Sequence, residues 1–399
     1  MKLYLTEKVS GVESEEQSKL AAHREKVRRI TKSILDLALE RQNLSLKIGE
    51  TKKALGQAIE NPEVERVLLS NMRSYAKEVG LDEYLAASLV SSLIESSKIA
   101  QREKLFQPEI RRHLQTAGIR RIGIVGAGRM GSWFGKYFLK VGADVSLFDQ
   151  DKKQGRELSS ELGCGSAASI EELSAESDLF LFAVPIRKTP REIEKLVEVI
   201  SAHNKSGSET VRILEISSIK AELSRAGLFR KKSSSSKSKI DLYSIHPLFG
   251  PGSQFFGKST VIQVYPNDPT FVRGLFPHFD YFYMDWRLHD KMMSRVLTLP
   301  HALSLVFSNA LSHDHLKKSE LRVAKQLHGP SFDVLMDLSQ RVLRENPEVY
   351  YEIQKTNQYG SKMLNRARVS FDELLTSLET QARFEEYFLE SKSSLSSES

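Results

Sequence analysis

Residues 120–151 place a glycine-rich turn between two apolar runs, and this stretch limits the possible folds most. The run Ile122–Val125 predicts a buried strand, and Gly126-Ala127-Gly128-Arg129-Met130-Gly131 follows it with G-x-G-x-x-G spacing. Aromatic residues then recur at helical spacing, and a second apolar run, 145–148, ends at Asp149. The order strand, glycine turn, helix, strand, acid predicts a Rossmann unit that binds a dinucleotide.

Each glycine of this turn has a separate expected role. Gly126 permits the tight turn, Gly128 lets the backbone approach a pyrophosphate, and Gly131 lets the helix pack close to the strand. The helix N-terminus offers free N–H groups to the phosphates. The residues expected to bind the cofactor are Gly126, Gly128, Arg129, Met130, Gly131, Asp149, Val184 and Pro185.

The choice of cofactor depends on Asp149, which lies 18 residues after Gly131. A carboxylate at this position suits hydrogen bonds to both ribose hydroxyls and repels a 2′-phosphate, which favours NAD over NADP. Lys152 and Lys153 follow closely and weaken that preference.

Composition excludes several classes of protein. A chain of 399 residues with 40% apolar residues predicts two or three domains with real cores. The net charge of +7 is accompanied by 51 acidic residues, and the basic runs lack interleaved aromatics, so no nucleic-acid partner is expected. The single cysteine, Cys164, excludes a disulfide framework and a cysteine-rich metal site, and we expect no metal. An N-terminus without an apolar core, and no apolar run of membrane-spanning length, predict a soluble cytoplasmic protein without membrane contact.

The N-terminal third has the pattern of three helices. Proline is absent from 14–55, and apolar residues recur there in a heptad-like pattern, which predicts one very long helix. Such a helix cannot bury its apolar seam alone and needs partner helices or a second chain. Asn61-Pro62 marks the start of a second helix, and a third is expected to end near Gln107, before a hinge at Pro108.

Two cations occupy one face of the first helix. Arg41 and Lys52 are 11 residues apart, which places them within about 20° of each other around the helix. Either their stems cover apolar surface while the charged groups reach water, or they form a buried anion site.

Polar residues also follow the predicted strands of the second part. In an open α/β sheet, ligands bind beyond the carboxyl ends of the strands, and Ser218 and His246 both follow such ends. A histidine there can take the proton of an alcohol whose carbon gives up hydride. Residues 231–239 have the low complexity of a mobile surface loop, and the pattern from 289 to 387 is helical.

Residues 20–105 resemble the all-helical chorismate mutase domain. The resemblance rests on Arg24-Glu25-Lys26, Arg41, Lys52, Glu65 and Ser97-x-x-x-Gln101, which fall at the family's spacing without gaps. It implies an interlocked dimer in which Arg41 holds a substrate carboxylate and Arg24 does the same from the partner chain. It further implies that Lys52 and Gln101 flank the ether oxygen of chorismate, while Glu65 and Ser97 hold its hydroxyl and polar edges. Asn61 and Val64 depart from the family, where an acid and an arginine are usual.

Residues 119–355 resemble prephenate dehydrogenase. The motifs are the glycine turn, Ser218-Ile219-Lys220, His246-Pro247-Leu248-Phe249-Gly250-Pro251, His289-Asp290, Pro300-His301, and Arg341 six residues before Pro347. The resemblance implies that His246 accepts the proton of the prephenate ring hydroxyl, that Ser218 supports that hydroxyl or the histidine, and that Arg341 holds a carboxylate. His289 and His301 are expected to line the pocket. Asp333 occupies a position where some members carry a second arginine.

The two resemblances together imply a bifunctional homodimeric enzyme of tyrosine biosynthesis. It would convert chorismate to prephenate, and then prephenate to 4-hydroxyphenylpyruvate with NAD. The expected multidomain fold has an all-helical mutase domain (14–107), an α/β Rossmann domain (119–285), a helical substrate and dimerisation domain (286–390) and a disordered tail (391–399). One alternative is an arogenate or related hydroxyacid dehydrogenase with a degenerate mutase domain. The other is a non-enzymatic, NAD-sensing dimeric scaffold.

Overall fold

The computed structural model describes residues 2–203, 210–229, 239–266, 268–313, 323, 327 and 329–396. Two compact units divide the chain: Met1–Ile110 with Gln254–Lys258, and Arg111–Ser253 with Ser259–Ser399. We call them unit 1 and unit 2. Unit 1 therefore differs from the expected contiguous domain 14–107, because it also takes a five-residue segment from within the expected range 119–285. Apart from Lys239, which begins a strand, the expected mobile loop 231–239 lies outside the described residues.

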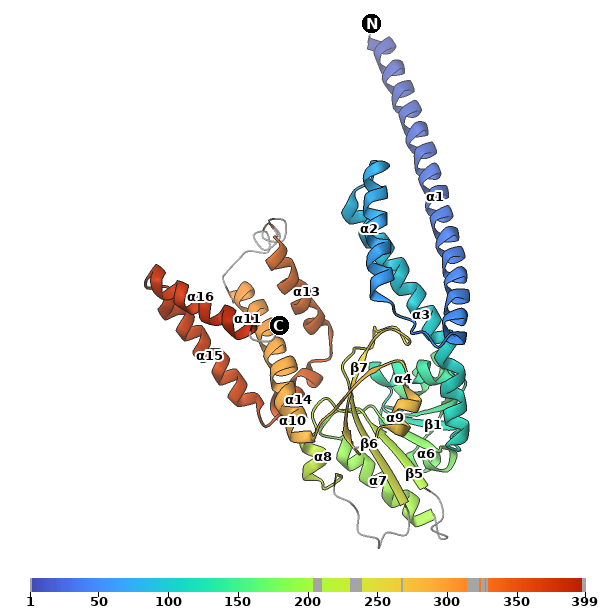
Figure 1. The fold of residues 1–399 in the computed structure, drawn as a ribbon, viewed down its shortest axis with the longest axis vertical. Helices are drawn as coiled ribbons and strands as arrows, with labels where there is room; N and C mark the ends of the chain where they lie inside the picture. The colour runs from blue at the N-terminus through green and yellow to red at the C-terminus, as the bar shows by residue number, and fades with distance from the viewer. Residues whose placement is uncertain are drawn as a thin grey trace. The chain divides into compact units, whose positions relative to one another are not determined.

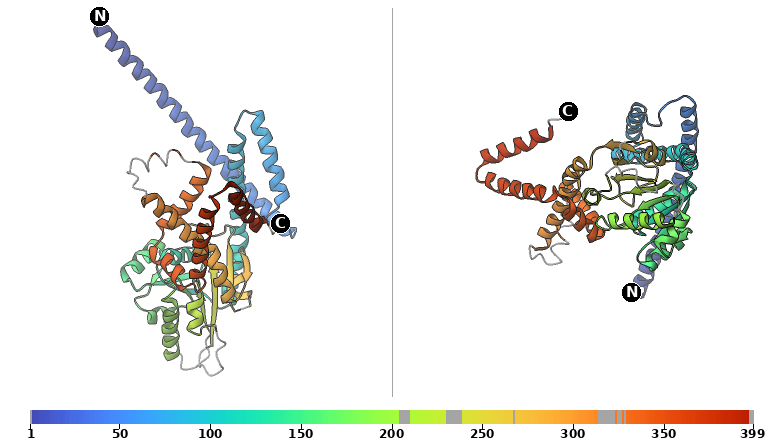
Figure 2. Two further views of the ribbon diagram at one scale, coloured as in Figure 1. Left: turned by 90° about the vertical axis from the view of Figure 1, so that its left-hand side faces the viewer. Right: turned by 90° about the horizontal axis from the view of Figure 1, so that it is seen from below.

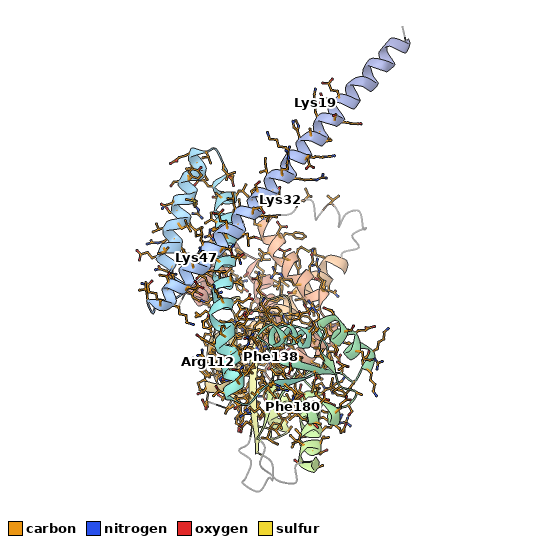
Figure 3. The ribbon with its side chains drawn as sticks, turned by 90° about the vertical axis from the view of Figure 1, so that its right-hand side faces the viewer. Lys19, Lys32, Lys47, Arg112, Phe138 and Phe180 are labelled. Atoms are coloured by element: carbon orange, nitrogen blue, oxygen red, sulfur yellow. The ribbon has the colours of Figure 1, made fainter. Side chains whose placement is uncertain are left out.

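Unit 1 consists of three helices, α1 (Lys2–Ala54), α2 (Pro62–Glu78) and the first part of α3 (Glu83–Thr116). The N-terminal half of α1 extends beyond α2 and α3 (Figures 1 and 2), and Lys19, Lys32 and Lys47 are spaced along it (Figure 3). Much of its apolar seam is open to solvent: Val27 is 61% exposed and Leu37 63%. Several turns of α1 thus carry an apolar stripe that unit 1 does not cover.

The expected hinge at Pro108 is wrong, because α3 continues through this residue to Thr116. Proline removes one backbone hydrogen bond and crowds the preceding turn. Ile110 and Leu114, four residues apart on one face, are 0% and 3% exposed. Their burial offsets the local cost of the proline, and the helix carries on.

Unit 2 is built on an eight-stranded sheet of order β3-β2-β1-β4-β5-β6-β7-β8. All neighbouring strands are parallel except β6 and β7. The apolar runs of the sequence form its centre, and Phe138 and Phe180, both at most 2% exposed, lie in the densely packed interior (Figure 3). The strands are β1 (Arg121–Val125), β2 (Asp144–Phe148), β3 (Gly165–Ser166), β4 (Leu179–Phe182), β5 (Thr210–Glu215), β6 (Lys239–Pro247), β7 (Thr260–Tyr265) and β8 (Asp280–Tyr283).

Helices connect these strands and then form a separate group. The connecting helices are α4 (Arg129–Lys140), α5 (Lys152–Leu162), α6 (Ile170–Glu176), α7 (Thr189–His203), α8 (Ala221–Arg225) and α9 (Thr270–Leu275). The later group, on one side of the sheet in Figure 1, comprises α10 (Trp286–Met293), η1 (Ser294–Thr298), α11 (Leu299–His313), α13 (Pro330–Arg344), α14 (Pro347–Thr356), α15 (Gly360–Ser377) and α16 (Gln381–Ser396). The expected fold class, helical, then α/β, then helical, is confirmed.

The expectation of a disordered tail from residue 391 is wrong as far as Ser396, where α16 ends. Serine hydroxyls compete with backbone groups for hydrogen bonds, but they can also bond to the preceding helical turn. Ser391 donates to the Tyr387 carbonyl (3.0 Å) and Ser394 to that of Glu390 (2.9 Å). The serine-rich sequence is therefore compatible with the helix, and residues 397–399 lie outside the description.

Candidate active sites

The glycine turn of unit 2 leaves room for a phosphate at its middle glycine. Gly126 has φ +107°, and a Cβ there would lie 2.5 Å from the Ala183 carbonyl oxygen. A Cβ on Gly131 would overlap the Gly126 carbonyl, whereas one on Gly128 would meet no atom of the described residues within 4 Å. The first and third glycines are thus required by close packing, and the second faces open space at the N-terminus of α4. This cradle fits a dinucleotide pyrophosphate.

A cleft of about 1020 Å³ opens beside this turn. It is lined by Gly128 and the two residues after it, by residues at the ends of β4, β5 and β6, and by parts of η1, α11 and α14. The expected site residues that line it are Gly128, Arg129, Met130, Val184, Pro185, Ser218, His246 and His301. The structure therefore brings the expected cofactor turn and the expected catalytic histidine into one cavity.

Asp149 follows β2, and its carboxylate is held by the backbone of the glycine turn. One oxygen accepts a hydrogen bond from the Ala127 N–H (2.7 Å), and the other accepts one from the Asp151 N–H (2.8 Å). Gln154, which the sequence analysis missed, lines the cleft and donates to the Ala127 carbonyl (3.0 Å). Asp149 thus fixes the shape of the turn as well as placing a negative charge beside it.

His246 stands near the carboxyl end of β6, and its ring is held from behind by a second histidine. Nδ1 of His246 lies 3.0 Å from Nε2 of His289, and Nδ1 of His289 lies 2.8 Å from a carboxylate oxygen of Asp290. His246 is 4% exposed, and the other two residues are fully buried. The same carboxylate accepts the backbone N–H groups of Lys220 and Ala221, both at 2.9 Å. His289 therefore lies behind His246 and does not line the cleft.

Burial sets the protonation of this chain of residues. It lowers the pKa of His246 well below the ordinary 6.5, and the neighbouring His289 and Lys220 lower it further. Burial, with Lys220, likewise lowers the pKa of His289. Burial raises the pKa of Asp290 to about 6. At pH 7 both imidazoles are therefore neutral and the carboxylate is ionised.

Beneath His246 lies a buried ion pair that sequence analysis did not identify. Lys220 Nζ lies 2.6 Å from a Glu215 carboxylate oxygen, and both side chains are fully buried. The ammonium also donates to the Ile245 carbonyl (2.7 Å), and Ser244 donates its hydroxyl to the same glutamate. The pair ties the ends of β5 and β6 together, next to the histidine expected to be catalytic.

The remaining expected residues of this site have differing positions. His301 lines the cleft, and its Nδ1 is buried with no hydrogen-bond partner among the described residues. Its ring packs edge-on against Tyr350, with 4.6 Å between the ring centroids. Ser218 lines the cleft, but the ring of His246 is held by His289 instead. Arg341 is exposed on α13 and is not among the residues that line the cleft. Acidic residues that the sequence analysis missed, Glu345 and Glu352, do line it.

In unit 1 the structure joins Arg41 of α1 to Ser97 of α3. The guanidinium donates to the Ser97 hydroxyl (2.6 Å) and to the Leu93 carbonyl (2.9 Å). Lys52 donates to the Ile59 carbonyl (2.6 Å) in the connection to α2. Both cations are half-buried and carry no carboxylate partner among the contacts of the described residues.

Gln101 of α3 is oriented by α1. Its amide nitrogen donates to the Ser45 carbonyl (2.7 Å) and hydroxyl (2.6 Å), and its stem lies where a Cβ on Gly49 would be, 2.9 Å from Cγ. Glu65, expected at the substrate hydroxyl, forms an ion pair with Lys98 (3.2 Å). Arg24 lies 17 residues before Arg41 on the same helix, roughly 26 Å away at the helical rise, and cannot reach this site within one chain.

A Rossmann sheet whose glycine turn shares a cleft with a buried histidine defines a nicotinamide-dependent dehydrogenase. In this chain it follows a helical unit with a cationic site. The chain matches the family "Chorismate mutase type II" over residues 23–102, and it is 36% identical over 87 residues to a chorismate mutase of Methanocaldococcus jannaschii. This alignment covers 88% of that protein and 22% of this chain. The chain belongs, through its N-terminal unit, to the chorismate mutase type II family.

The rest of the chain matches two further families. Residues 286–391 match the prephenate dehydrogenase dimerization domain, and residues 85–197 match the NAD-binding domain of D-isomer specific 2-hydroxyacid dehydrogenases. The T-protein of Enterobacter agglomerans is 22% identical over 375 residues, which cover 91% of this chain and 88% of that protein. These matches confirm the predicted resemblance to chorismate mutase fused to prephenate dehydrogenase. They also confirm the prediction that the chain is an enzyme that binds NAD.

Solved structures share the fold of the second part. A prephenate dehydrogenase from A. aeolicus, in complex with hydroxyphenyl propionate and NAD⁺, superimposes with a TM-score of 0.51 at 18% identity, over 68% of this chain and 96% of that one. No helix among the described residues is long and apolar enough to span a membrane. No group of three potential metal-ligating side chains occurs in that same part of the chain.

Proposed function

We propose that this chain is a homodimeric, bifunctional enzyme of tyrosine biosynthesis. Unit 1 rearranges chorismate to prephenate, and unit 2 oxidises and decarboxylates prephenate to 4-hydroxyphenylpyruvate with NAD. The observation that carries the proposal is the shared cleft of the glycine turn and His246, in a chain whose first unit holds Arg41, Lys52 and Gln101 around α1.

The mutase chemistry needs no nucleophile and no external proton. A Claisen rearrangement requires a dianion folded into a reactive shape, and stabilisation of the negative charge that grows on the breaking ether oxygen. Arg41, already oriented by Ser97, suits a carboxylate of the substrate. Lys52 supplies an ammonium for the ether oxygen, and Gln101 would turn one of the two N–H groups that it now donates to Ser45 toward the same oxygen when the substrate binds.

The proposed mutase site is completed by Arg24 of another chain. Arg24 lies too far along α1 to reach Arg41 of its own chain, and the apolar stripe of α1 is uncovered. A second copy of the chain, paired along α1, would cover the stripe and bring Arg24 to the partner's site. The dimerization domain matched at 286–391 supports the same stoichiometry.

In unit 2, His246 acts as general base. It removes the proton of the ring hydroxyl as the carbon that bears it gives up hydride. When bound on the glycine turn, NAD supplies the hydride acceptor. Oxidation leaves a ring ketone conjugated to the diene, and this ketone accepts the electron pair released when the ring carboxylate leaves as carbon dioxide. The ring becomes aromatic, and the oxygen that lost its proton regains it from His246 as a phenol.

The direct test supplies the purified chain with chorismate and NAD and follows chorismate loss, NADH formation and 4-hydroxyphenylpyruvate together. We expect all three, and we expect His246→Asn to lower NADH formation by about two to four decades while chorismate loss and NAD binding persist. Arogenate in place of prephenate serves as the competing substrate. Near-normal turnover by His246→Asn, or preference for arogenate, would overturn the assignment.

A further inference from the structure

His246, His289 and Asp290 form a hydrogen-bonded line that ends at the cleft. We propose that His289, held by Asp290, is a positioning residue that fixes the tautomer of His246, so that the ring nitrogen facing the substrate carries no proton. The inference rests on the proposed dehydrogenase function and adds a residue that acts through the base without touching the substrate.

The direction of each hydrogen bond begins at Asp290. Its carboxylate accepts hydrogen bonds from the backbone N–H groups of Lys220 and Ala221. The carboxylate is therefore ionised and acts only as an acceptor. The contact of 2.8 Å with Nδ1 of His289 is therefore a hydrogen bond donated by the imidazole. A neutral imidazole carries one proton, and Nε2 of His289 is left with a lone pair.

This lone pair determines the state of His246. Nε2 of His289 lies 3.0 Å from Nδ1 of His246, so only a proton on Nδ1 makes the contact a hydrogen bond. The other tautomer would place two lone pairs against each other in a site closed to water, which is costly. Nε2 of His246 is thus free of a proton, and His246 lines the cleft.

The charged groups around the line agree with this assignment. Lys220 and Glu215 pair with each other beneath the base, and Asp290 balances the ammonium from α10. When Nε2 takes the substrate proton, the imidazolium keeps its Nδ1–H bond to His289, and that bond strengthens with the charge. Asp290 needs no proton of its own for this role.

Two substitutions of His289 separate positioning from packing. Asparagine places its amide near the former Nδ1, so it can still donate to Asp290 but is too short to reach His246. Glutamine extends to the former Nε2 and can offer an acceptor to His246. We expect His289→Asn to lower kcat with prephenate about 100-fold and His289→Gln by less than about tenfold, with the KM of prephenate and the NAD affinity nearly unchanged in both.

A second measurement needs no turnover. Diethyl pyrocarbonate acylates unprotonated imidazole nitrogens, and mass spectrometry locates the product. We expect His246 of the wild-type chain and of His289→Gln to react several-fold faster than His246 of His289→Asn. The mutase activity of each variant and its NAD binding report whether the two units are folded.

The outcomes separate this inference from the proposed function. Equal turnover and equal labelling of the two variants would overturn the positioning role while NADH formation by the wild type upholds the function. If the wild type forms no NADH from prephenate but the labelling rates differ as expected, the proposed function fails and the positioning of His246 stands.

Discussion

Arg102 donates a hydrogen bond to the carbonyl oxygen of Phe256, a residue 154 positions further along the chain (3.3 Å). Both are nearly fully buried, and both belong to unit 1. The same guanidinium forms an ion pair with Glu60. Arg102 is next in sequence to Gln101. Glu60 is next to Ile59, whose carbonyl accepts the hydrogen bond from Lys52. The segment Gln254–Lys258, which lies in sequence within the dehydrogenase part, thus packs in unit 1 beside the residues of the proposed mutase site.

The first prediction concerns this segment. Phe256→Ala should destabilise unit 1 by about 3 kcal/mol, because a buried aromatic side chain is removed. The measurement is the temperature at which mutase activity is lost. Phe279→Ala, at a buried position of unit 2, should leave that temperature unchanged. For the same reason a chain truncated at residue 107 should retain mutase chemistry with lowered stability. A truncated chain as stable as the full one would argue against the role of the segment.

Lys52→Ala should lower the mutase kcat by about 10²–10³, because it removes the charge that stabilises the developing oxyanion. Prephenate oxidation should continue unchanged. Lys53→Ala is the matched control: the neighbouring lysine is 59% exposed and pairs with Glu109. Steady-state rates with chorismate and with prephenate check both variants, and comparable mutase losses in the two would rule out a specific role for Lys52.

Gly49→Ala should impair the mutase by displacing Gln101. The new Cβ would lie 2.9 Å from Cγ of Gln101, whose amide is held by Ser45 and cannot move freely. We expect kcat to fall about tenfold or more, with the dehydrogenase unaffected. Glu50→Ala, one residue further on an exposed position, provides the comparison. Unchanged mutase kinetics in Gly49→Ala would show that Gln101 tolerates the shift.

Asp149 should decide between NAD and NADP by its charge. Asp149→Asn keeps an oxygen that can accept the Ala127 N–H and removes the repulsion of a 2′-phosphate. The ratio of kcat/KM for NAD to that for NADP should fall by about tenfold or more. Asp149→Ala, which also loses the hydrogen bond to the turn, should weaken both cofactors. An unchanged ratio in the asparagine variant would place the ribose elsewhere.

Acid should destabilise unit 2 through His246 and His289, which are both buried. Because burial lowers the pKa of His246 and His289 in the folded state, the unfolded chain binds protons below pH 6.5 that the folded chain does not. This contribution to stability is therefore complete only well above pH 6.5 and is lost as the pH falls through 6.5, by roughly 0.7 kcal/mol for each histidine between pH 7 and 6. Asp290 has the opposite effect on stability, in a lower pH range. Because its pKa is raised from 3.8 to about 6 in the folded state, the folded chain gains stability as the pH falls from 6 toward 3.8.

Urea unfolding followed by tryptophan fluorescence can measure this effect in unit 2 alone, because both tryptophans, Trp133 and Trp286, lie in that unit. The double variant His246→Gln/His289→Gln should flatten the pH dependence between 7 and 6. His23→Gln, on the exposed part of α1, should leave it unchanged. An equal slope in the double variant would mean that these histidines titrate alike in both states.

Local sequence predicted much of this structure, because the relevant signals lie within a few residues. The φ of +107° at Gly126 and the buried strands around it follow from glycine spacing and apolar runs. The three N-terminal helices follow from periodicity, and Asn61 caps α2 as a short polar residue before proline should. At Pro108 and at the serine-rich end the structure differs from the local preference, because burial of Ile110 and hydroxyl bonds to the previous helical turn outweigh that preference.

The sequence by itself determined which chemical groups the chain carries. It also determined which of them follow a strand and which of them lie together on one face of a helix. Only the tertiary structure decided which of them meet. His289 could be identified from its motif, but its place behind His246 depends on the packing of α10 against the sheet. The burial of the Lys220–Glu215 pair depends on β6, whose Ile245 carbonyl accepts a hydrogen bond from the ammonium. The link from Arg102 to Phe256 joins positions 154 residues apart. Such contacts arise because burial selects partners by shape and charge in space, and no local pattern along the chain encodes that choice.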